Sequence, residues 1–172
     1  MFIEAKKLVG LPVAAFDTQR KIGVIRELII DPENGHLMGF LVQVASASWR
    51  IFSAGKILSE VDIREWDPNG IVTEKEENLV EREEIVRIDN ILKQNISLLG
   101  MSAKTESGKG LGNVENFLID TDTSTVAKYY LKDLLGKSRI FTSEKVVKID
   151  KFIIFADDVS LPPHSAAGVT AT

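Results

Sequence analysis

The sequence contains no cysteine among its 172 residues and only two histidines, His36 and His164. Without cysteine, the chain cannot form a disulfide framework, a thiolate zinc site, an iron–sulfur cluster or a cysteine nucleophile. Neither histidine has a carboxylate or a second histidine at the spacing of a metal-ligand set, so a metal site or a histidine base has little support. We therefore expect no cofactor, no catalytic metal and no enzymatic activity.

Long apolar runs are also missing. Glu4, Lys6 and Lys7 interrupt the start of the chain, and a signal peptide would need an uninterrupted apolar stretch there. No other stretch approaches the roughly 20 apolar residues of a membrane helix. Together with the absence of cysteine, this pattern predicts a cytoplasmic protein.

The chain has no excess of positive charge. Its formal net charge is −4 at pH 7, and its lysines are scattered among acidic residues. Nucleic-acid-binding proteins usually present a basic face that neutralises phosphates, so we expect no direct contact with nucleic acid. Apolar residues make up 44% and charged residues 27% of the chain, which is typical of a globular protein. The sequence leaves open whether the chain forms a homodimer.

An internal repeat of about ninety residues is the main feature of the sequence, and repeats of this kind indicate structurally similar units. From Gly23 onward the two copies align without a gap, as far as Asp67 in the first and Ala156 in the second. We therefore expect two similar domains, at residues 5–73 and 97–160. The matching segments are Leu8–Val13 with Leu98–Ala103, Ile22–Asp31 with Leu111–Asp120, Arg50–Ser53 with Arg139–Thr142, and Lys56–Leu58 with Lys145–Val147.

Each copy has the pattern of a small all-β domain. Short apolar, β-branched runs are separated by turns, with no alternation of strands and helices. The segment Asp31–Gly35 predicts a hairpin, because its proline presets φ and its glycine tolerates a positive φ. Copies of about 65 residues favour a closed barrel, which leaves no exposed edge. The recurring glycines at positions 10, 23, 100 and 112 fit barrel bends, or alternatively the close approach of a ligand. The strands of the first copy are expected at residues 13–16, 23–31, 37–44, 49–53, 57–63 and 70–73.

The segment between the copies, residues 74–96, is an acidic linker followed by one short amphipathic helix. Its apolar residues Ile85, Ile88, Ile91 and Leu92 recur at helical spacing. We expect this stripe to be mostly buried and to fix the two barrels relative to each other. The proline-led segment 161–172 is expected to be a disordered tail.

Four aromatic residues are candidates for contact with a protein partner: Trp49, Phe52, Trp66 and Phe141. Large aromatics often anchor protein interfaces, but on small barrels they commonly pack the core or its rim. The sequence leaves both interpretations open for these residues.

The first copy resembles the PRC-barrel family. The resemblance rests on Leu-x-Gly-x-x-Val at residues 8–13 and on the glycine, leucine and Ile-Asp positions between Gly23 and Val42. The second copy matches through Leu99-Gly100, Leu111-Gly112 and Ile119-Asp120. This family includes the cytoplasmic part of the photosynthetic reaction-centre H subunit and the C-terminal domain of the ribosome-maturation factor RimM.

The resemblance implies a non-catalytic docking or adaptor module built from two tandem PRC-type barrels, which bind proteins or assemblies. The shared residues are turn and core residues, so they specify a fold and no binding residues. A second hypothesis is a sensor that binds a small ligand or an ion between the barrels. An apolar pocket with convergent polar groups would favour the sensor, and an exposed apolar patch would favour docking.

Overall fold

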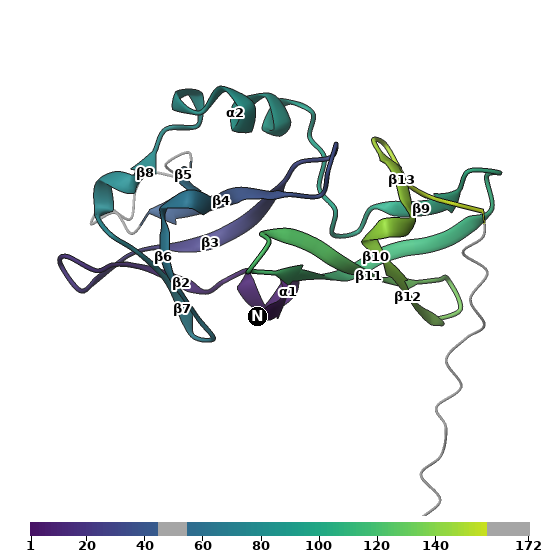
Figure 1. Ribbon diagram of the computed structural model, residues 1–172, viewed down its shortest axis with the longest axis horizontal. Coiled ribbons are helices and arrows are strands. Elements are labelled where there is room, and N and C mark those ends of the chain that lie inside the picture. Colours follow the sequence, from purple (N-terminus) through teal and green to yellow (C-terminus); the bar gives the residue numbers. More distant parts are fainter. Residues whose placement is uncertain (45–54, 158–172) are drawn as a thin grey trace, which may run out of the picture.

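The computed structural model describes residues 1–44 and 55–157. Two of the candidate aromatics, Trp49 and Phe52, and the expected tail at 161–172 lie outside the described residues. The chain forms two curled sheets that lie side by side, with one helix over the first of them (Figure 1). The expectation of an all-β, barrel-like architecture is confirmed.

The first sheet contains seven strands in the order β6-β7-β2-β3-β4-β5-β8. All neighbouring strands are antiparallel except β2 and β7, which run parallel. The 3-10 turn η1 (Glu60–Asp62) connects β5 to β6. The strands are β2 (Pro12–Ala15), β3 (Arg20–Ile30), β4 (Leu37–Val44), β5 (Lys56–Ser59), β6 (Ile63–Asp67), β7 (Gly70–Thr73) and β8 (Leu79–Val80).

The second sheet repeats this plan in the order β12-β11-β10-β9-β14-β13, again with one parallel pair, β9 and β14. The 3-10 turn η4 (Ser143–Lys145) corresponds to η1. Its seventh strand, β1 (Phe2–Glu4), comes from the start of the chain and pairs with β10. The other strands are β9 (Ser102–Thr105), β10 (Gly110–Asp120), β11 (Thr125–Lys132), β12 (Ser138–Thr142), β13 (Val146–Ile149) and β14 (Ile153–Phe155).

The register of the repeat differs from the expected gap-free alignment. In the long hairpins, equivalent residues are 89 positions apart, and the irregularity after Ile25 recurs after Val114. After the hairpins, equivalent residues are only 83 positions apart. Phe40 pairs with Leu58, and its equivalent Tyr129 pairs with Phe141, so Leu58 corresponds to Phe141. The β4–β5 connection, residues 45–55, is six residues longer than the β11–β12 connection, residues 133–137.

The expected pairing of Lys56–Leu58 with Lys145–Val147 is therefore wrong. Lys56–Leu58 corresponds to Arg139–Phe141 in the structure. Both segments of the second copy begin with a basic residue followed by two apolar residues. The pattern alone could not decide between them, because alternating strands resemble one another after a shift of register.

One continuous hydrophobic core runs through both sheets. Short helix α1 (Ala5–Leu8) contributes two side chains, Ala5 and Leu8, that are completely buried in it. Strand β1 pairs Ile3 with Ile119 of the second sheet. The first unit thus begins with a strand that belongs to the second sheet, and the two sheets cannot be separated at residue 5.

Helix α2 (Val86–Lys93) lies over the outer face of the first sheet (Figure 1). Ile88 and Ile91 are buried there against Ile29 and Ile57, and the other two stripe residues, Ile85 and Leu92, are partly buried. Among the described residues, this cluster draws only on the helix, the segment before it and the first sheet.

The expectation that the apolar stripe fixes the two barrels to each other is therefore wrong. The physical reason is that β1, α1 and the shared core already join the two sheets. The apolar residues of α2 therefore pack on the first sheet alone, within the described residues. Within residues 1–44 and 55–157, no helix is long and apolar enough to cross a membrane.

Candidate functional site

A cleft of about 890 Å³ lies between α2 and the β13 strand of the second sheet. The polar side of α2 forms one wall, the turn between β3 and β4 forms the floor, and β13 forms the opposite wall. The cleft is larger than three other hollows of about 370, 490 and 460 Å³, and residues of both sheets and of α2 line it.

Arg87 connects the helix wall of the cleft to the β3–β4 turn through hydrogen bonds. Its Nε donates to Asp31 Oδ2 at 3.0 Å, and its Nη2 donates to the same oxygen and to Glu33 Oε2, the latter at 3.1 Å. These hydrogen bonds, to Asp31 first and then to Glu33, raise the pKa of the Arg87 guanidinium. Asp31 is 2% exposed, and its Oδ1 accepts the Glu33 backbone N–H at 3.0 Å. The arginine thus ties the helix to the β3–β4 turn.

The floor is formed where the hairpin turns of the two sheets meet. The Leu37 N–H donates to the Ser124 carbonyl at 2.7 Å, and the Val126 N–H donates to the Gly35 carbonyl at 3.0 Å. The Ser124 hydroxyl also bonds to Glu60. Tyr129 is buried in the floor, and this burial raises the pKa of its hydroxyl. Backbone bonds therefore fix the floor across the boundary between the sheets.

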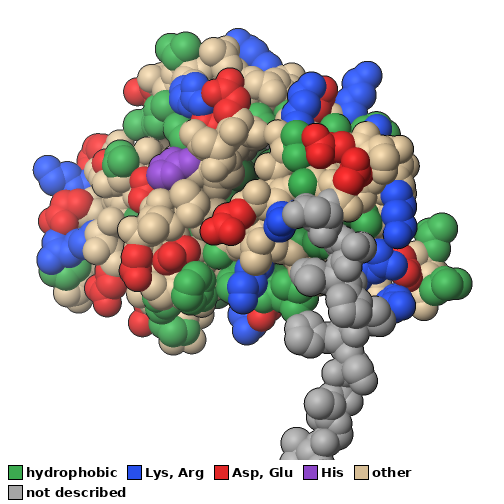
Figure 2. Space-filling model, turned by 45° about the vertical axis from the view of Figure 1, so that its right-hand side comes forward, with side chains coloured by type: hydrophobic (Ala, Val, Ile, Leu, Met, Phe, Trp, Pro, Cys, Tyr) green, Lys and Arg blue, Asp and Glu red, His purple; other side chains and the backbone are tan. Residues whose placement is uncertain are grey.

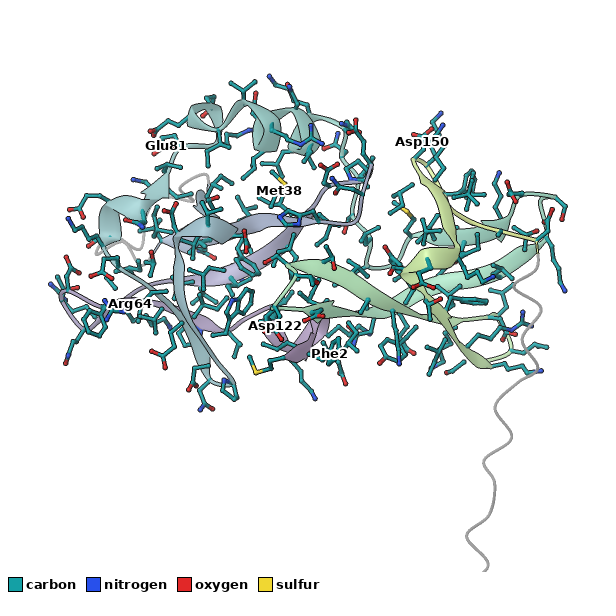
Figure 3. The ribbon with its side chains drawn as sticks, in the orientation of Figure 1. Phe2, Met38, Arg64, Glu81, Asp122 and Asp150 are labelled. Carbon is teal, nitrogen blue, oxygen red and sulfur yellow. The ribbon has the colours of Figure 1, made fainter. Side chains whose placement is uncertain are left out.

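The opposite wall consists of β13 and the turn after it. Asp150 lies at the tip of this hairpin (Figure 3) and pairs with Lys148 at 3.4 Å. Val147 is 53% exposed on this wall, and Val86 is 71% exposed on the helix wall. The cleft therefore carries an exposed valine on each wall, and its charges are arranged in ion pairs.

The residues that line the cleft provide surface for contact and few groups suited to catalysis or metal binding. Among the described residues that line the cleft there is no histidine, and no group of three His, Asp or Glu side chains in the described chain could hold a metal. Both carboxylate oxygens of the buried Asp31 already accept hydrogen bonds, Oδ1 from the Glu33 backbone N–H and Oδ2 from Arg87. On the face shown in Figure 2, acidic and basic side chains are intermixed with apolar ones.

The candidate aromatics lie elsewhere. Phe141 is 2% exposed and packs on Phe155 with ring centroids 4.9 Å apart, so its assignment to a binding surface is wrong. The reason is its register, which places it on the inner face beside Tyr129. Trp66 is partly buried and packs edge-to-face on Phe40, with centroids 5.9 Å apart. It packs against the shared core of the two sheets and does not line the cleft.

Sequence reasoning missed the two exposed valines. Val86 could have been found, because it follows Ile85 directly and so lies off the helical stripe, on the side expected to face water. Val147 gave no such signal, because the sequence alignment matched it with Leu58, a residue of a different strand. The Arg87–Asp31 contact joins residues 56 positions apart, which no local pattern indicates.

The comparisons with known proteins agree with the fold of the first unit. A family model described as the PRC-barrel domain matches residues 1–90, just over half of the 172 residues. The match extends from β1 into helix α2. No curated protein matches the chain. The chain belongs to the PRC-barrel domain family.

Proposed function

We propose that this protein is a non-catalytic docking module, and that a loop or extended segment of a partner protein binds in the cleft between α2 and β13. The observation that carries the proposal is the pair of exposed valines, Val86 and Val147, on opposite walls of the cleft. A segment lying between them would remove apolar surface from water on both sides. The ion pairs of Arg87 and Lys148 also line the cleft, where they would help to select a partner.

We also propose that residues 97–160 are a second PRC-barrel. The same strand order, the parallel pair at the same place and the equivalent irregularities at Ile25 and Val114 support this. The cleft would then be a composite site that exists only because two copies are joined. The turn-to-turn backbone bonds support a cleft with a fixed width, which lowers the ordering cost of binding.

A sensor for a small ligand is the second candidate, because the volume of about 890 Å³ lies within the roughly 300–1,000 Å³ range of ligand pockets. Such pockets are mostly apolar, with a few polar groups free to orient the ligand. Here the buried polar group, Asp31, is already bonded to Arg87 and Glu33. This arrangement favours a protein segment over a small molecule.

The test compares captured proteins. The wild-type chain and a Val86→Asp/Val147→Asp double variant are immobilised and exposed to a lysate of the native host, and bound proteins are quantified by mass spectrometry. A protein that the wild type retains is purified, and its affinity is measured. We expect the double variant to bind it at least tenfold more weakly, because two carboxylates replace apolar contact.

Val61→Asp is the matched control, because Val61 is 81% exposed and does not line the cleft. The control should retain wild-type affinity. Equal binding by all three proteins would refute the cleft as the docking site. A small molecule that native mass spectrometry finds on the wild type, and not on the double variant, would instead support the sensor.

A further inference from the structure

The outer faces of the two sheets can be compared position by position. On the first sheet, Ile29, Leu41 and Ile57 face helix α2. With the observed separations of 89 and 83 residues, their equivalents on the second sheet are Leu118, Tyr130 and Ile140. Tyr130 lies directly opposite Ile140, as Leu41 lies opposite Ile57. The apolar face that receives a helix is therefore present on both sheets.

In the part of the chain that the structure describes, helix α2 covers the first of these faces and no comparable helix covers the second. Ile57 is fully buried under α2, with Met38 also pointing from β4 toward the helix (Figure 3). Its equivalent, Ile140, is 43% exposed. Leu118 and Tyr130 are partly exposed. Two short helical elements lie beside this sheet in the described part of the chain, α1 along β10 and the 3-10 turn η4 along β11, and they leave Ile140 exposed.

The edge beside the second face is also open. In the first sheet, β5 pairs with β8, so Ile57 lies opposite Val80 and Leu58 opposite Leu79. The equivalent strand β12 is the last strand of its sheet in the part of the chain that the structure describes. An edge strand presents unpaired N–H and C=O groups that can add a strand from another chain. Within residues 1–44 and 55–157, the second sheet therefore has no counterpart of the strand and the helix that residues 79–93 supply to the first.

Charge indicates the kind of segment that would fit. Lys128 lies directly opposite Leu118, at the place where the first sheet has Gly39. Its side chain is exposed, and no ion pair involving it is found within the described residues. The nearby Lys132 is paired with Glu115 at 3.5 Å. An acidic side chain on the incoming segment would complement Lys128.

We propose that the face of Leu118, Tyr130 and Ile140, together with the edge of β12, binds a segment of a partner protein that is built like residues 79–93 of this chain. That segment is a short strand followed by an amphipathic helix, with isoleucine or leucine three residues apart and an acidic residue toward Lys128. This surface is separate from the cleft and does not depend on it.

The probe is a fluorescently labelled peptide with the sequence of residues 77–95, which carries more acidic than basic residues. Its binding to the full chain is measured by anisotropy, and the contact is located by amide hydrogen exchange. We expect binding with slower exchange in β12, and at least tenfold weaker binding to Ile140→Asp. Lys128→Glu should weaken binding several-fold, and a peptide with proline at the positions of Leu79 and Val80 should bind more weakly.

The control is Val147→Asp, which alters the cleft and should bind the peptide normally. Because Ile140 is already half exposed, its variant should keep the wild-type melting temperature within a few degrees. The proposal is overturned by no binding up to about 1 mM, by equal binding to Ile140→Asp, or by slower exchange at β5 instead of β12. It is also overturned if the free chain is a dimer that Ile140→Asp dissociates, since a second copy would then cover the face.

Discussion

Replacing Ile88 by alanine tests how helix α2 is held. Ile88 is 1% exposed and belongs to the same buried cluster as Ile29 and Ile57 of the first sheet. Truncation of a buried isoleucine to alanine costs roughly 2–5 kcal/mol, because apolar contact is lost and a cavity remains. Helix α2 has eight residues, and isolated helices shorter than about 12–15 residues are marginal in water. Its stability must therefore come largely from contacts outside the helix, and this packing is their apolar part.

We expect the substitution to act locally. A loss of about 2 kcal/mol makes opening of the helix roughly 30-fold more frequent, so amides of α2 should exchange faster by a similar factor. Amides of β10 should exchange as in the wild type, because the Ile88 cluster has no described residue from the second sheet. Hydrogen exchange measured by mass spectrometry separates the two regions.

Val86→Ala is the matched control, because it removes a β-branched side chain from the same helix at a position that is 71% exposed. It should change the free energy of unfolding by less than about 0.5 kcal/mol. Unchanged exchange of α2 in Ile88→Ala would show that the stripe does not hold the helix. Equal acceleration in α2 and β10 would show that the helix joins the two sheets after all.

Three further predictions follow from individual contacts. Hydrogen bonds from Lys93, and to a smaller extent from Arg82, lower the pKa of Asp89. The ionised carboxylate therefore stabilises α2 at neutral pH, and this stabilisation is lost as the pH falls below about 4. Asp89→Asn should remove this acid-dependent change in the amide exchange of α2, and an unchanged pH profile would contradict the prediction. Burial raises the pKa of Glu27, so the ionised carboxylate opposes folding at neutral pH. Glu27→Gln should therefore raise the midpoint of urea unfolding at pH 7 but not near pH 3. A lower midpoint of the variant at pH 7 would refute this prediction. Ile3→Pro removes an N–H from the β1–β10 pair and should lower the melting temperature, whereas Phe2→Ala, at a residue 61% exposed, should have little effect; equal melting temperatures would show that β1 contributes nothing.

Local patterns in the sequence predicted local structure well. The turn chemistry of Asp31–Gly35 predicted the hairpin, which the structure closes with a hydrogen bond from the Gly35 N–H to the Asp31 carbonyl and a φ of 71° at the glycine. The stripe from Ile85 to Leu92 predicted a helix within one or two residues of its observed bounds. Both features depend on neighbours in the chain, so the sequence contains the information that they need.

Features that depend on distant residues were not predicted. The side of the sheet on which Phe141 lies follows from the register of β11 and β12, and a shift of register moves every side chain to the opposite face. The pairing of β1 with β10 joins residues more than 110 positions apart. The cleft likewise depends on how far α2 lies from β13, which neither segment specifies by itself.

The pairing of β1 with β10 has a consequence for synthesis of the chain. Residues 2–4 are made more than a hundred residues before their partners at 118–120. Contacts of such long sequence separation form late and slowly. Throughout that interval the first unit carries an unpaired strand, so the second sheet can be completed only after most of the chain has emerged. A chaperone that shields Phe2–Glu4 would therefore have to act before residues 118–120 have been made.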